Sequence, residues 1–163
     1  MNIDAWERLT DATERRLPED DLALLGALHC FTAQRLESAA EAVRDASHPD
    51  ESADGRERLQ RILHAFLREC WDALDSVARE VNLCMFSAFP DAGLYPPHEM
   101  TRQCGLYTVR KRLRESPATE ARPVTRLLWE RTREGADEPY RRLSFLYNLA
   151  LFVPVPLTED GAL

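Results

Sequence analysis

The sequence of 163 residues lacks several features on which common classes of enzyme depend. Its six glycines are isolated, so no glycine-rich loop can cradle a phosphate, and no nucleotide-binding strand–loop–helix pattern occurs. Gly-x-Ser-x-Gly, Cys-x-x-Cys and His-x-x-x-His spacings are absent, and the four histidines are scattered. These absences argue against nucleotide-binding enzymes, serine hydrolases and zinc proteins. We therefore expect neither a cofactor nor a metal.

Long apolar runs and disulfide-type cysteine spacings are also missing. No stretch of about eighteen apolar residues exists, and the opening MNIDAWERLTD holds acids where a signal peptide would hold bases. The four cysteines are widely spaced and lie mostly in apolar runs, which favours reduced thiols. We therefore expect a cytoplasmic protein without a membrane segment.

The composition that is present is typical of one globular domain, with 44% hydrophobic and 30% charged residues. The charge is uneven along the chain. Residues 1–100 hold 20 acids and 10 bases, whereas residues 101–163 hold 8 acids and 11 bases, all eleven of them within 102–142. This basic segment could attract phosphate backbones or an acidic partner, or it could pair with the acidic half of the same fold; the sequence leaves these readings open.

The longest predicted element is a helix over 54–88, which contains no proline and, after Gly55, no glycine. Its apolar residues recur every three or four positions, so they share one side of the helix. On the other side, acids and bases at spacings of three or four are expected to form solvated surface ion pairs. These charged residues are Arg68, Asp72, Asp75, Arg79 and Glu80.

Shorter helices before and after this one complete an all-α fold, which we predict to be a helical bundle of about five to six helices around the long central helix. The bundle is expected to form a single domain over 1–163, with connecting loops at 47–55 and 89–105 and an extended tail at 153–163. The other helices are predicted over 3–17, 18–46, 106–115, 123–134 and 139–152. The buried side of the helix over 18–46 is expected to comprise Leu22, Leu25, His29, Thr32, Leu36, Ala39 and Val43.

The candidate functional surface combines the basic segment with the last helix. Its residues, proposed to contact a ligand or RNA, are Arg141, Arg142, Tyr147 and Asn148. A structural interpretation stays open for each of them, because a tyrosine on an apolar helix face often belongs to the core. No residue is assigned a catalytic or metal-binding role.

Two segments, LRECWDALDSVAREVN in the long helix and YRRLSFLYNLALFVPVP around the last helix, resemble the HEPN superfamily. These helical bundles occur in many prokaryotic RNases, toxins and abortive-infection proteins. The resemblance covers 59–156 and implies a homodimer with a cleft between the subunits that acts on RNA. The family signature is an arginine, often followed by asparagine, with a histidine further along the same helix. Here Asn148 is retained, but Tyr147 replaces the arginine and Phe152 replaces the histidine.

This departure bears directly on activity. Attack by a ribose 2′-hydroxyl needs a proton acceptor or a stabilising cation, and neither Tyr147 nor Phe152 provides one at neutral pH. We therefore predict a non-catalytic, dimeric helical-bundle protein that binds a partner protein or nucleic acid. The alternative is an RNase of the HEPN type with a displaced active-site set of Arg142, Asn148 and His98.

Overall fold

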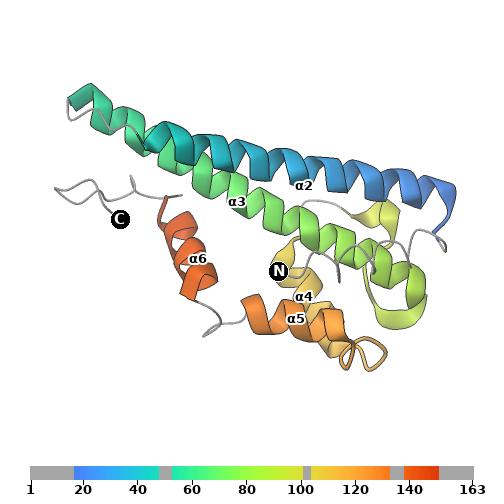
Figure 1. Cartoon of the computed structure of the whole chain (residues 1–163). Coiled ribbons are helices and arrows are strands. Elements are labelled where there is room, and N and C mark those ends of the chain that lie inside the picture. The colour runs from blue at the N-terminus through green and yellow to red at the C-terminus, as the bar shows by residue number, and fades with distance from the viewer. Residues whose placement is uncertain (1–16, 48–52, 101–103, 133–137, 151–163) are drawn as a thin grey trace. The chain divides into compact units, whose positions relative to one another are not determined.

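A computed structural model describes residues 17–47, 53–100, 104–132 and 138–150, and within these residues the chain is helical and has no β-strand (Figure 1). Two short 3-10 helices, η1 (Pro90–Ala92) and η2 (Pro97–Glu99), lie between α3 and α4. The predicted all-α helical bundle is confirmed. The α-helices are α2 (Glu19–Ala46), α3 (Ala53–Ala88), α4 (Leu106–Glu115), α5 (Pro123–Thr132) and α6 (Glu138–Ala150).

Proline and glycine mark several of the element ends. Pro90 follows α3 closely and opens η1, and Gly93 ends η1 with a φ of 71°, a left-handed conformation that glycine adopts without strain. Helix α4 coincides with the helix predicted over 106–115. The predicted tail at 153–163, and all of the predicted helix over 3–17 except Leu17, lie outside the described residues.

The chain forms two compact units, and both long helices contribute to each of them. The first unit comprises Met1–Phe31 and Leu74–Trp129, and the second comprises Thr32–Ala73 and Glu130–Leu163. None of the described helices combines the length and the apolar character that a membrane crossing requires.

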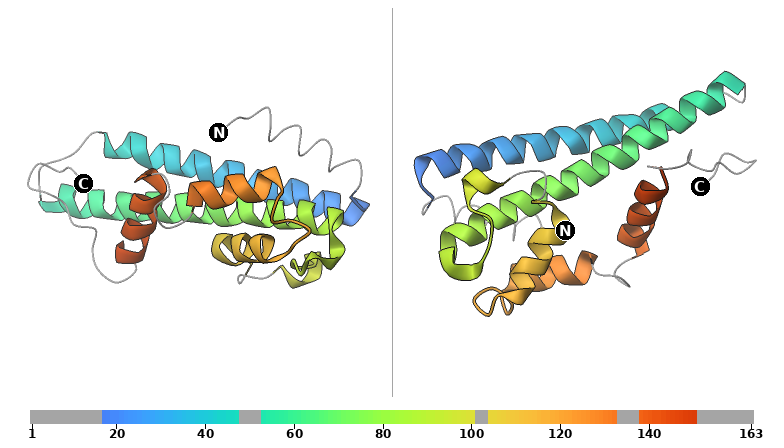
Figure 2. Two further views of the ribbon diagram at one scale, coloured as in Figure 1. Left: turned by 90° about the horizontal axis from the view of Figure 1, so that it is seen from below. Right: turned by 180° about the vertical axis from the view of Figure 1, so that it is seen from behind.

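In the first unit, the beginning of α2 lies beside the end of α3 (Figure 2). Leu25, Leu83 and Cys84 form a buried cluster between the two helices. The Ser76 hydroxyl donates a hydrogen bond to the backbone carbonyl of Leu28 at 3.1 Å, which fixes the alignment of the helices. Helix α4 adds three buried residues that share one of its sides, namely Leu106, Val109 and Leu113.

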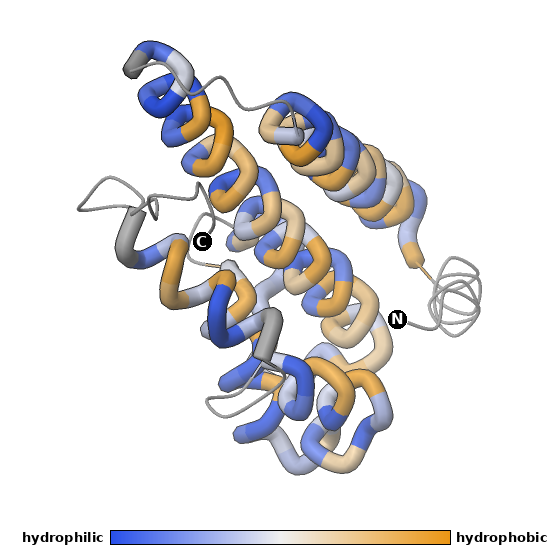
Figure 3. Tube along the Cα trace, turned by 60° about the vertical axis from the view of Figure 1, so that its left-hand side comes forward, coloured by the Kyte–Doolittle hydropathy of each residue, from blue (hydrophilic) through white to orange (hydrophobic). Residues whose placement is uncertain are grey.

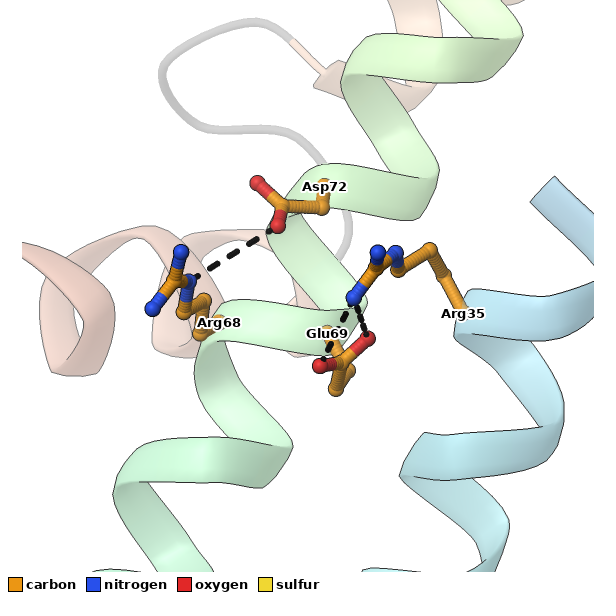
Figure 4. A network of polar contacts seen from close by, with 4 residues as sticks. All are labelled: Arg35, Arg68, Glu69 and Asp72. Carbon is orange, nitrogen blue, oxygen red and sulfur yellow. Dashed lines mark hydrogen bonds and ion pairs between the residues drawn. The ribbon is translucent and has the colours of Figure 1, made fainter. Parts of the chain in front are cut away.

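In the second unit, the remainder of α2 lies beside the first part of α3, and an ion pair joins the two helices (Figure 4). Arg35 Nη1 donates to both carboxylate oxygens of Glu69, at 3.0 and 2.9 Å. On the same helix, Arg68 and Asp72 form a looser pair of 3.9 Å in which the Arg68 side chain is exposed. The Arg68–Asp72 pair is the kind of surface contact that the sequence pattern predicted.

The predicted buried side of α2 is only partly correct. Three of the seven predicted residues are buried, namely Leu25, Thr32 and Ala39, whereas Leu22, His29, Leu36 and Val43 are exposed. The two groups are offset by about 50° around a helix of 3.6 residues per turn, and only one of them faces the core. Figure 3 shows the resulting alternation of apolar and polar segments along α2.

Candidate functional site

The last helix, α6, presents one of its sides to Trp71 of α3 within the second unit. The ring centroids of Trp71 and Tyr147 are 4.8 Å apart with an interplanar angle of 6°, and Tyr140 lies 6.3 Å from Trp71 at 23°. Tyr140 and Tyr147 are two helical turns apart, so both rings lie on the same side of α6. Tyr147, a predicted contact residue, therefore packs against α3.

Away from the Trp71 stack, α6 carries the other three predicted residues, Arg141, Arg142 and Asn148, all of them exposed. Phe145 lies among them and is 65% exposed. Asn148 Nδ2 donates to the backbone carbonyl of Ser144 at 2.8 Å within the same helix. Arg141, Arg142, Phe145 and Asn148 are called the outer face of α6 below. Phe145 was not among the residues that the sequence singled out, because nothing in the sequence shows that this ring is exposed.

The outer face of α6 offers groups for binding rather than a catalytic set. Its two guanidinium groups, its aromatic ring and its amide do not accept protons at neutral pH. His98, the third member of the predicted displaced set, belongs to the first unit, where it lies 3.7 Å from the carboxylate of Glu99. Neither unit by itself contains all members of that set. Phe152, at the position of the family histidine, lies outside the described residues.

The end of α3, in the first unit, holds a buried amide that fixes the segment following the helix. Asn82 is 0% exposed, and its Nδ2 donates to the backbone carbonyl of Tyr95 at 2.7 Å. The backbone N–H of Tyr95 donates back to Asn82 Oδ1 at 3.1 Å. One side chain thus satisfies both backbone groups of the partly buried Tyr95.

Three charged residues on this part of α3 correct the sequence prediction. Asp75 Oδ1 accepts a hydrogen bond from the backbone N–H of Leu106 at 2.8 Å, which caps the first turn of α4. Arg79 Nε donates to the backbone carbonyl of Cys104 at 3.1 Å. The expected solvated ion pairs are therefore wrong here, because the chain after α3 folds back over these side chains.

Glu80 is the third of these residues and is 1% exposed. Its Oε2 lies 3.5 Å from Nδ1 of His29 on α2. Glu80 therefore belongs to the contact between α2 and α3 and not to the solvent-facing side of α3.

Helices α4 and α5 of the first unit carry a group of stacked arginines and aromatic rings. The guanidinium carbon of Arg114 lies 3.8 Å from the ring centroid of Trp129, and that of Arg110 lies 5.0 Å from the same centroid. Arg110 also lies 5.5 Å from the ring centroid of Tyr107, which is 67% exposed. We call Tyr107, Arg110, Arg114 and Trp129 the arginine–aromatic surface. All three distances fall within the range of cation–π attraction.

Two further arginines of the basic segment contact rings and a carbonyl in the segment that follows α3, so their role is structural. Arg112 lies 3.6 Å from the ring centroid of Tyr95 and donates from Nη1 to the carbonyl of Gly93 at 2.9 Å. Arg122 lies 4.5 Å from the ring centroid of Phe89. Some arginines of the basic segment therefore form cation–π contacts with aromatic rings of the same unit. The sequence showed the excess of arginine here, but it did not show which rings would lie beneath it.

The described residues contain no group of three or more histidine, cysteine, aspartate or glutamate side chains that could hold a metal ion. Cys84 and Cys104 are buried free thiols, whereas Cys30 is exposed. Burial raises the pKa of the Cys104 thiol to about 11, although the nearby Arg79 and Arg112 lower it in part. Cys104 is therefore a structural thiol and not a nucleophile.

Comparison of the chain with known proteins does not assign it to a family. No protein-family model matches the sequence, and neither the curated proteins nor the solved structures give a significant match. Functional interpretation therefore depends on the contacts, exposure and charge of the described residues.

Proposed function

We propose that this chain is a non-catalytic helical-bundle protein that acts by binding a macromolecular partner, and that it does so as a homodimer of the HEPN-like type which the sequence resemblance implies. The outer face of α6 is the proposed subunit contact. The observation that carries this proposal is the 65% exposure of Phe145 on a helix whose other side is already held by the Trp71 stack.

The physical argument rests on the two sides of α6. Tyr140 and Tyr147 engage Trp71, so the inner side of the helix is occupied within the subunit. An exposed phenylalanine ring next to arginine is typical of interface centres, where burying the ring removes a large apolar surface from water. In a two-fold contact the same face of both copies meets, so one substitution acts twice.

Sedimentation velocity at micromolar concentrations tests the dimer. We expect the wild-type chain to sediment as a dimer and Phe145→Asp to sediment as a monomer, because a charge in an apolar contact is strongly unfavourable. Leu36→Asp is the matched control, since Leu36 is also an exposed apolar residue of the second unit. A monomeric wild type, or a dimer that Leu36→Asp disrupts and Phe145→Asp does not, would contradict the α6 contact.

Incubation with mixed RNA tests the non-catalytic part of the proposal. We expect intact RNA, because the outer face of α6 lacks a proton acceptor. Cleavage that persists with EDTA and disappears in Arg142→Ala would overturn this expectation and favour the displaced RNase set. Far-UV circular dichroism of Arg142→Ala controls for loss of the fold.

A further inference from the structure

The exposed side of α4 in the first unit combines an aromatic ring with a row of cations. Leu106, Val109 and Leu113 bury one side of this helix. The positions of Tyr107, Lys111 and Arg114, at spacings of three and four residues, place them together on the opposite side. All three side chains are exposed, and the adjacent Arg110 is half-buried between the rings of the arginine–aromatic surface. The outward side of α4 thus presents an aromatic ring together with several positive charges.

Helix α5 extends this surface. Arg126 and Trp129 are three residues apart and share one side of α5, and the Arg126 side chain is exposed. From Cys104 to Trp129 the sequence holds six bases and only two acids, Glu115 and Glu120. Glu115 lies 3.9 Å from Lys111 in an exposed pair and offsets only one of these positive charges. The local charge is therefore positive even though the whole chain carries a net charge of −7.

We infer that the arginine–aromatic surface, together with Lys111 and Arg126, is a binding site for single-stranded nucleic acid. Tyr107 supplies an exposed ring on which an unpaired base stacks, and the cations around it contact phosphates. Arg110 and Arg114 lie over the Trp129 ring at 5.0 and 3.8 Å from its centroid, a contact that restrains their guanidinium groups before the ligand arrives.

The combination of rings and cations favours a nucleic acid over an acidic protein. Carboxylates of an acidic segment would satisfy the cations, but they offer no aromatic face that could stack on the exposed ring of Tyr107. A single strand presents phosphates and unpaired bases at close intervals, and both meet a matching group on this surface. A duplex keeps its bases stacked inside, so it can use only the cations. This site lies in the first unit and does not depend on the α6 contact proposed above.

Fluorescence anisotropy of labelled single-stranded RNA and DNA of about 12 nucleotides tests the site with the full-length chain. We expect binding that weakens between about 50 and 200 mM salt, with a slope of log K against log salt near −3 if about four phosphates are contacted. Binding of either RNA or DNA supports the site, and comparing them assigns the preferred sugar. A duplex of the same length is expected to bind more weakly.

Variants separate stacking from charge. Tyr107→Ala should weaken binding about tenfold or more with an unchanged salt slope, whereas Tyr107→Phe keeps the ring and should retain binding. Arg114→Gln should lower the magnitude of the slope by about 0.7. Arg61→Gln removes the same charge from an exposed position on α3 in the second unit and should change neither value. Circular dichroism verifies that each variant is folded.

Several outcomes would overturn the site. One is the absence of binding at the lowest salt concentration. Another is equal affinity for the single strand and the duplex together with no effect of Tyr107→Ala, which would mean that the surface attracts polyanions through charge alone. Competition by polyglutamate as effective as competition by unlabelled single strand would instead indicate an acidic protein partner.

Discussion

The two parts of α3 carry similar charged residues and use them differently. In the second unit, Arg68 and Asp72 pair with each other along the helix surface at 3.9 Å, and the Arg68 side chain is 77% exposed. In the first unit, Asp75 and Arg79 bind backbone groups of the segment that precedes and opens α4. The spacing of charges is similar in both parts, so spacing does not decide their role. The deciding difference is whether another part of the chain covers the helix.

The largest effect is expected from Asn82→Ala in the covered part of α3. This change leaves the N–H and carbonyl of the partly buried Tyr95 without their partner and removes a fully buried side chain, so the free energy of unfolding should fall by about 3 kcal/mol. Urea denaturation followed by circular dichroism measures the change. Arg68→Ala, on the exposed part of the same helix, should cost about 0.5 kcal/mol or less. Similar costs for the two variants would remove the contrast between the two parts.

A second effect concerns the cap of α4. Asp75→Ala removes the acceptor of the Leu106 N–H and should lower the free energy of unfolding by about 1 to 2 kcal/mol. Gly105→Ala should also destabilise the protein, because its Cβ would lie 2.9 Å from Asp75 Oδ1. In a double-mutant cycle, Gly105→Ala should cost less once Asp75 is alanine. Additive costs would show that contact with the Asp75 carboxylate is not the reason why alanine at position 105 destabilises the protein.

A smaller effect distinguishes the two ion pairs of the second unit. Arg35 bonds both oxygens of Glu69 in a partly buried setting, so the double-mutant cycle should give a coupling of about 1 kcal/mol. The Arg68–Asp72 cycle should give about 0.3 kcal/mol, because that pair is exposed and longer. Both couplings are measured by urea denaturation at low and high salt. A larger coupling for Arg68–Asp72 than for Arg35–Glu69 would show that partial burial does not determine the strength of these pairs.

The smallest effect on stability, and the clearest on reactivity, comes from the thiols. Iodoacetamide near neutral pH should modify the exposed Cys30 first, the half-buried Cys70 more slowly, and Cys104 only after unfolding. Burial, with the Glu69 carboxylate nearby, raises the pKa of Cys70, which slows its reaction further. Mass spectrometry of time points measures this order, and rapid labelling of Cys104 in the folded protein would contradict it.

The same thiol predicts a dependence of stability on pH. Well below pH 9 the Cys104 thiol is protonated in the folded and unfolded chains alike, so it leaves stability unchanged. As the pH rises from 9 to about 11, the unfolded chain releases this proton while the raised pKa holds it in the folded chain. Stability should therefore fall across this window, and Cys104→Ala should reduce that dependence. Urea midpoints measured at several alkaline pH values test it.

The candidate contacts were predicted unevenly. The sequence predicted α6, because a proline-bounded helix is visible in a sequence, and the structure leaves Arg141, Arg142 and Asn148 exposed, while their role in binding stays a prediction. The sequence could not predict that Tyr147 stacks on Trp71 or that Phe145 is exposed, since the side that a helix buries depends on which neighbour it packs against. The arginine–aromatic surface was missed for the same reason, because Arg114 and Trp129 lie on different helices.

The sequence by itself determined the all-α class and the extents of helices such as 106–115, because periodicity and proline act over a few residues. Only the tertiary structure decided which charges are solvated. Asp75, Arg79 and Glu80 are buried or engaged because α2 and the segment around α4 cover the end of α3, and the cost of burying a charge is met there by backbone hydrogen bonds and a facing histidine. Such long-range contacts leave no periodic trace in the sequence.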